Sequence, residues 1–350
     1  MASELASSTV SEAITSVVMP LTQNASASLA HCLARADAKD EAGTPFTGKA
    51  TVHAVFSDQS KLEDVLNAVE RYAEEQPSPE DVYVWLDLFC SNPHAKAAVP
   101  MLWWQTTFKS GLKSIGSSCL LLTPWREPAA LRRSWCLLAL QQSLSVGSSL
   151  IISLAESELA DFDAALESDM EEVLKSFEKG GAAALQKQSE AESAEVKAAL
   201  DAAIGRDGGF DDFHMKLLEQ LHRWTLARAQ KVLATLEPSA RAKSTIVDHV
   251  AKLLQDFGDL EAAEPLCKEV VEQRKERLGA NHAETIEAVN NHALLLHQLG
   301  KLEDAEPLSK AKLAGCRRTL GDRHPDTITA IDTHSQLLSD LGKLDEALPL

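Results

Sequence analysis

The chain has 350 residues, of which 45% are hydrophobic and 5% aromatic, and this composition is typical of two or three globular domains. Its 34 basic and 52 acidic residues give a formal charge of −18, which repels phosphate groups instead of neutralising them. Nucleic acid and anionic membrane surfaces are therefore not expected as partners.

Six cysteines are scattered along the chain without a CxxC pair, so the sequence predicts neither a zinc site nor a redox motif. No run of about 18 apolar residues occurs, and the N-terminal stretch has no basic segment followed by an apolar one. We expect a cytoplasmic protein with reduced cysteines, without a metal and without a bound cofactor.

Residues 1–48 are rich in Ala and Ser, and glycines and a proline stand near the end of this stretch. Such a composition favours a weakly helical or disordered arm that ends in a linker.

Residues 49–155 alternate short apolar runs with segments of helical periodicity. Strands are predicted in four runs and helices between them, a pattern typical of a parallel sheet with helices on both faces. The predicted strands are Thr51–Phe56, Val82–Phe89, Cys119–Thr123 and Ser149–Leu154, and the predicted helices are 61–73, 98–113 and 129–144.

Residues 156–209 are rich in Ala, and Gly180-Gly181 interrupts them. The stretch 156–202 holds 13 acidic and 4 basic residues, which favours a pair of solvated helices acting as a connector.

Residues 210–350 contain a tandem repeat. After an amphipathic helix predicted over 217–236, the phrases GDLEAAEPL, GKLEDAEPL and GKLDEALPL begin at Gly258, Gly300 and Gly342. The units 258–299 and 300–341 share 18 identities in 42 positions, and 239–257 reads as a degenerate leading half-repeat. Leu-Gly endings and Pro325 near a helix start predict two helices per unit, hence an all-α solenoid.

The pattern LG-x-x-H-x-x-T-I-x-A, followed by LL-x-x-L-G-K-L-x-x-A-x-P-L, closely resembles the long tetratricopeptide repeats of kinesin light chains and nephrocystin-like proteins. The resemblance implies a concave groove for extended peptides, lined by the first helix of each repeat and using asparagines of an Asn-Asn-Leu-Ala phrase. Here the phrase reads Asn290-Asn291-His292-Ala293, and Thr333 takes the place of Asn291 in the next repeat. The expected peptide-binding residues are Asn291, Asn290 and Thr333, although the same positions could simply cap or solvate their helices.

The N-terminal domain carries a second resemblance. The stretches Val84–Asn92, Trp103-Trp104, Pro124–Pro128 and Ser134-Trp-Cys-Leu137 resemble TIR-like or heterokaryon-incompatibility-like domains. Ligands of open α/β sheets bind beyond the carboxyl ends of the strands, where Ser57, Asp58, Asp87 and Asn92 form the polar set of a vestigial ligand site. The competing interpretation is that these side chains close turns and cap helices.

NAD-cleaving TIR domains carry a glutamate three residues after the Cys of their Trp-Cys pair. In this chain Ala139 occupies that place, and a methyl group cannot stabilise the charge that develops on the ribose. We therefore expect an adaptor that binds a peptide or protein partner and is not an enzyme. The alternative is a nucleotide-processing enzyme that cleaves NAD and is regulated by the repeats.

The last repeat is incomplete in this sequence, because Leu350 lies nine residues into it. Solenoids bury the apolar face of each unit against the next unit. We expect poor coverage of Leu344, Ala347 and Leu350, and either a truncated sequence or self-association through this face.

Overall fold

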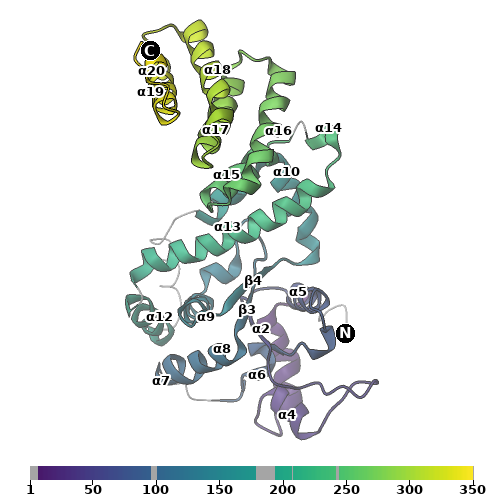
Figure 1. Cartoon of the computed structure of the whole chain (residues 1–350). Coiled ribbons are helices and arrows are strands. Elements are labelled where there is room, and N and C mark those ends of the chain that lie inside the picture. Colours follow the sequence, from purple (N-terminus) through teal and green to yellow (C-terminus); the bar gives the residue numbers. More distant parts are fainter. Residues whose placement is uncertain (1–6, 96–100, 179–193, 207, 242–243, 350) are drawn as a thin grey trace. The chain divides into compact units, whose positions relative to one another are not determined.

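The computed structural model describes residues 7–95, 101–178, 194–206, 208–241 and 244–349 (Figure 1). The chain forms two compact units, one made of residues 1–164 and 172–224, the other of residues 165–171 and 225–350. Helices α10 and α13 each contribute residues to both units. None of the described helices is long and apolar enough to cross a membrane.

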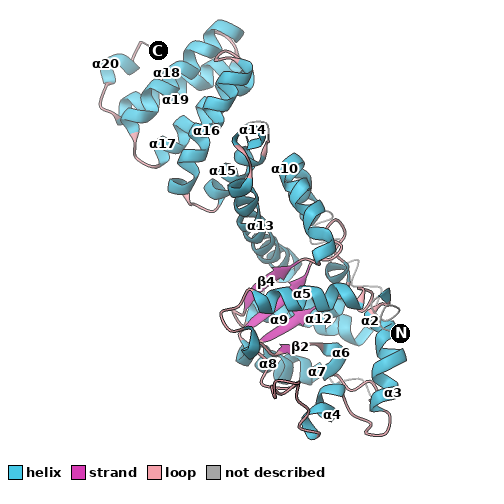
Figure 2. Ribbon diagram, turned by 90° about the vertical axis from the view of Figure 1, so that its right-hand side faces the viewer, coloured by secondary structure: helices cyan, strands magenta, loops and turns pink. Residues whose placement is uncertain are grey.

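The first unit contains a small parallel sheet with the strand order β2-β1-β3-β4 (Figure 2). Its strands are β1 (Val52–Val55), β2 (Val84–Trp85), β3 (Ser117–Leu121) and β4 (Ser149–Ser153). The predicted α/β class and the parallel arrangement are confirmed, and β2 lies at one edge of the sheet.

The two faces of the sheet bury different side chains because alternate residues of a strand point to opposite sides. One face places Val52, Ala54, Cys119 and Leu121 in an apolar core with α5 (Leu62–Glu74). The other face is covered by α8 (Lys109–Ile115) and α9 (Ser134–Ser145). Helix α9 is buried on nearly every side, since it packs between the sheet and α12 (Ala194–Arg206).

The described part of the N-terminal stretch is helical and contributes to the first core. It contains α2 (Val10–Ala13), the π-helical turn η1 (Ile14–Val18), α3 (Met19–Thr22) and α4 (Leu29–Arg35). Val10, Ala13 and Val18 are each at most 2% exposed and pack against the β1 and α5 residues. Of the two expectations for 1–48, the helical one therefore describes residues 10–22 and 29–35, and these helices are a packed layer of the unit.

The apolar run 82–89 is a strand only at Val84–Trp85, and it continues as the short helix α6 (Asp87–Cys90). The predicted strand was too long because a buried helical turn and a buried strand are equally apolar. Other short elements of this unit are η2 (Pro79–Asp81), α7 (Met101–Trp103), η3 (Trp104–Phe108) and η4 (Ala129–Arg132).

The acidic stretch contains two helices, α10 (Glu156–Glu178) and α12, but the expectation that they are solvated is wrong. Helix α10 buries Phe162, Leu166, Met170, Val173 and Phe177, and α12 buries Ala199, Leu200, Ala203 and Ile204. The apolar residues of α10 recur every three or four positions on both sides of a kink at Asp169, and its acidic residues are exposed or half-buried. The Gly180-Gly181 break lies outside the described residues.

The second unit is a succession of helices in which consecutive members pack against each other. After α13 (Gly209–Thr235) and α14 (Pro238–Arg241) come three antiparallel helix pairs, as the repeat predicts. They are α15 (Ile246–Asp256) with α16 (Leu260–Leu278), α17 (Ala283–Gln298) with α18 (Leu302–Leu320), and α19 (Pro325–Asp340) with α20 (Leu344–Ala347).

Candidate functional site: the first helices of the repeats

We call α15, α17 and α19 the first helices and α16, α18 and α20 the second helices. The turn inside each pair contains a glycine in the left-handed region, with φ of 79° at Gly258, 72° at Gly300 and 74° at Gly342. Residues with a Cβ avoid this region, so the glycine that opens each repeat phrase is required by the turn. The repeated sequence therefore fixes the same hairpin three times.

A histidine starts each of the last two first helices. The Nδ1 atom of His282 accepts a hydrogen bond from the Glu284 amide at 3.3 Å, and His324 Nδ1 accepts one from Asp326 at 3.2 Å. Each imidazole thus satisfies one of the amides that a helix start leaves without a partner. The recurring histidine of the LG-x-x-H phrase is a helix cap.

The two other recurring histidines are structural as well. His292 and His334 are 7% and 5% exposed, and His334 Nδ1 lies 2.5 Å from the hydroxyl of Ser309 on α18. Burial lowers the pKa of both imidazoles. Within the described residues no group of three His, Cys, Asp or Glu side chains could hold a metal ion.

The solvent-facing side of α17 carries a narrow line of side chains, which we call the α17 stripe. Its members are exposed and recur every three or four residues, so they lie on one side of the helix. They are Glu287, Asn291, Leu294 and Gln298. Asn291 offers a carboxamide that no other described residue engages, and Leu294 adds apolar surface with 42% of its area exposed.

The two other predicted peptide-binding residues are already hydrogen-bonded. The Asn290 Oδ1 atom accepts a hydrogen bond from Lys312 Nζ of α18 at 2.7 Å. The Thr333 hydroxyl donates to the Thr329 carbonyl of its own helix at 2.8 Å. Of the three side chains, Asn291 alone is both exposed and uncommitted.

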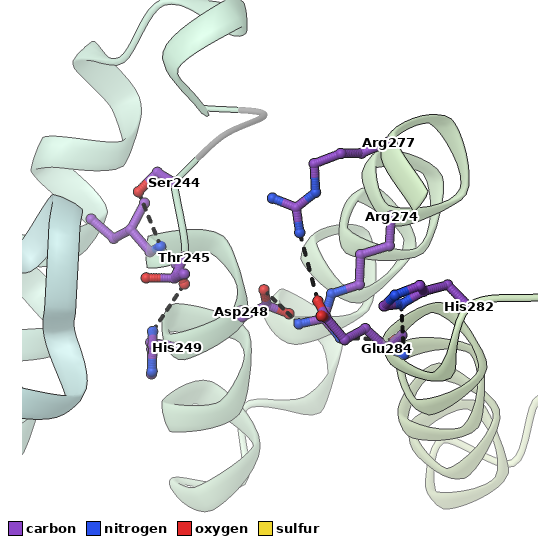
Figure 3. A network of polar contacts seen from close by, with 9 residues as sticks. Ser244, Thr245, Asp248, His249, Arg274, Arg277, His282 and Glu284 are labelled. Atoms are coloured by element: carbon purple, nitrogen blue, oxygen red, sulfur yellow. Dashed lines mark hydrogen bonds and ion pairs between the residues drawn. The ribbon is translucent and has the colours of Figure 1, made fainter. Parts of the chain in front are cut away.

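A polar network joins the consecutive helices α15, α16 and α17 (Figure 3). Arg274 of α16 donates to Asp248 of α15 and to the Glu284 carbonyl of α17, both at 3.0 Å. Arg277 forms an ion pair of 3.7 Å with the Glu284 carboxylate. Burial raises the pKa of Asp248, and Arg274 partly offsets that effect.

Sequence reasoning missed Arg274 and Lys312 because they do not recur. Asp248 and Asn290 are equivalent positions 42 residues apart, and each contacts a cation of the following second helix. The repeat equivalents of the cations are Cys316 for Arg274 and Val270 for Lys312, so the repeat pattern contains no signal for either contact. Burial lowers the pKa of Lys312.

The polar set predicted for the first unit is only partly brought together. Asp58 forms an ion pair of 3.1 Å with Arg133, and Asp87 accepts a hydrogen bond of 3.2 Å from the indole of Trp135. Ser57, which is 1% exposed, accepts a hydrogen bond from the Gln59 amide in a tight turn. Both carboxylates therefore lie near the start of α9.

Asn92 lies apart from these residues. Its amide donates to the Ser26 carbonyl at 2.9 Å, and its oxygen accepts from the His94 amide at 3.0 Å. All four predicted side chains thus have a local structural contact, and burial raises the pKa of Asp87 to about 6.

Comparison with known proteins identifies the repeats. The sequence model of the tetratricopeptide repeat family matches residues 243–311 and 285–350. No curated protein matches the chain.

Solved structures with a similar arrangement include BtubC (BKLC) of P. vanneervenii, at 19% identity and a TM-score of 0.31, covering 55% of this chain and 68% of that one. A second similar structure is that of nearly identical TPR-like repeats from a Podosopora anserina protein described as a kinesin light chain. It has 17% identity to this chain and a TM-score of 0.34. That match covers 55% of this chain and 88% of the other. The family match assigns tetratricopeptide repeats to the C-terminal part of the chain, residues 243–350.

Proposed function

We propose that this protein is a scaffold that holds an extended peptide or protein segment against the first helices of its repeats. The observation that carries the proposal is the exposed, uncommitted carboxamide of Asn291 in the middle of the α17 stripe. A carboxamide both donates and accepts, so it can bind the backbone of an extended segment whatever its side chains. Leu294, three residues further on, supplies apolar contact.

The charge of the chain gives only a weak indication of the partner. Residues 225–350 hold 16 basic and 20 acidic side chains, so the part of the chain from residue 225 onwards, which contains the repeats, carries −4 of the total −18. The acidic total charge favours a basic partner, and this preference is therefore small at this surface. Shape and backbone hydrogen bonds are the main basis of recognition in this proposal.

The test starts from peptides selected on the full-length protein by display. Asn291→Ala should weaken the binding of a selected peptide by about 1 to 2 kcal/mol, the range for one lost hydrogen bond that leaves its partner unsatisfied. Glu276→Ala, which changes an exposed residue of the second helix α16, serves as control and should leave the affinity unchanged. Equal affinities of the wild type and the Asn291 variant for every selected peptide in calorimetry would reject the assignment.

We propose further that the first unit is not catalytic. In support, Ala139 is 1% exposed and lies inside α9, where a glutamate would be buried against apolar neighbours. Purified protein incubated with NAD should release no nicotinamide. Release that disappears in an Asp87→Asn variant would instead establish the alternative, an NAD-cleaving enzyme that uses the half-buried carboxyl beside Trp135.

A further inference from the structure

A cleft of about 720 Å³ in the first unit lies outside the sites described above. One wall is formed by the edge strand β2 and its flanking residues, from Val82 to Leu86. The opposite wall consists of Leu29, Ala30 and Leu33 of α4 together with the segment 44–48. Val69 of α5 and Phe89 of α6 close the cleft.

The lining of this cleft is mainly apolar and incompletely covered. Val82, Val84 and Phe89 pack against the first core, yet each keeps part of its surface exposed. Phe46 on the opposite wall is 58% exposed. Glu80 is the single charged side chain among the described residues that line the cleft.

The β2 wall also offers the backbone N–H and C=O of one residue, Val84. In the parallel register Val52↔Val84 and His53↔Trp85, the Tyr83 carbonyl accepts from the Thr51 and Val52 amides. Because backbone groups of successive strand residues point to opposite sides, Val84 directs its N–H and C=O away from β1. The strand order places no described strand on that side of β2.

An apolar cleft beside an unpaired strand edge fits an extended peptide better than a compact small molecule. An extended peptide can pair its backbone with Val84 and place alternate side chains between β2 and α4. A compact small molecule would use the apolar walls but not the outward N–H and C=O of Val84. The absence of basic residues from the described lining disfavours an acidic segment.

We propose that this cleft binds an extended segment of a partner protein with alternating apolar side chains, which adds a strand to the sheet beside β2. The site lies in the first unit and is separate from the repeat surface. The protein would then recognise extended segments in both of its units, by a strand edge in one and by helices in the other.

The experiment uses the full-length protein and a set of eight-residue peptides of the form Lys-Xaa-Thr-Xaa-Thr-Xaa-Thr-Lys, with Val, Ile, Leu or Phe at Xaa. At least one peptide should bind in calorimetry. N-methylation of alternate amides on the side that faces β2 should weaken binding at least tenfold, because it removes pairing and retains the side chains. Hydrogen exchange of the Val84 amide should slow down in the complex.

A wall variant and a matched control complete the test. Leu33→Glu should abolish binding, and Leu21→Glu, at a leucine that is 68% exposed and does not line the cleft, should not. If N-methylation has no effect, the cleft binds side chains only and strand addition is wrong. If no peptide of the set binds, or if binding survives Leu33→Glu in a folded variant, the proposal is overturned.

Discussion

His53 is the residue whose chemistry conflicts most clearly with its surroundings. It lies on the central strand β1 with 1% exposure, and its ring meets Trp85 and Phe108 edge-on at centroid distances of 5.4 and 5.5 Å. Neither ring nitrogen has a hydrogen-bond partner among the described residues. Burial therefore lowers the pKa of His53 from 6.5 to about 4.

This lowered pKa makes the stability of the first unit depend on pH. Between pH 6.5 and about 4 the unfolded chain binds a proton that folded His53 excludes, so the unit loses stability as the pH falls through this window. Replacing His53 by Leu, which has a similar volume, removes both the proton and the unsatisfied nitrogens. The variant should gain about 2 kcal/mol relative to wild type between about pH 7 and about pH 5.

Urea unfolding followed by tryptophan fluorescence measures this effect, because all six tryptophans lie within residues 85–224 and report on the first unit. The exposed His31→Leu variant is the control. A stability difference between wild type and His53→Leu that stays constant from about pH 7 to about pH 5 would contradict the buried neutral imidazole. Asp87 titrates in both proteins, so its effect cancels.

At the scale of elements, the sequence predicted most of the architecture. The strand runs beginning at Thr51, Cys119 and Ser149 agree with β1, β3 and β4 within two residues, and the repeat period located the helix pairs. Short-range patterns sufficed there because turns and periodicity are local. The strand order, the burial of His53 and the packing of α10 depend on contacts distant in sequence.

The site was predictable to a smaller extent. The resemblance predicted Asn290 and Asn291 alike as peptide-binding residues. Their difference depends on α18, because Lys312 of that helix donates to Asn290, whereas Asn291 is exposed. The polar set of the first unit is brought together only in part, for a similar reason. Asp58 and Asn92 follow different elements, and their partners Arg133 and Ser26 are 75 and 66 residues away in the chain.

The turn between α17 and α18 requires a residue in the left-handed region, and substitutions at Gly300 test this requirement. Gly300→Ala should destabilise this pair by about 1 to 2 kcal/mol, because its φ of 72° lies in the left-handed region although the space around a Cβ is free. Gly300→Asn should cost less, since Asn tolerates this conformation. Hydrogen exchange of the α17 and α18 amides measures both variants, and equal protection in all three proteins would refute the argument.

At the scale of the whole molecule, the last repeat leaves apolar surface uncovered. Leu344 and Leu348 are 59% and 85% exposed, whereas the earlier equivalents of Leu344, Leu302 and Leu260, are half-buried. Ala263 and Ala305 are fully buried, but the equivalent Ala347 is half-exposed. In the earlier repeats the following first helix packs against the second helix that carries these side chains.

The central claim is that the first helices of the repeats hold an extended segment. The most direct measurement places a photo-reactive amino acid at Leu294 or at Leu320, which are 42% and 45% exposed on the first helix α17 and the second helix α18. With a peptide selected on the full-length protein, the proposal predicts a crosslink from position 294 that Asn291→Ala reduces, and none from position 320. Crosslinking from position 320 alone, or equally from both positions, would contradict it.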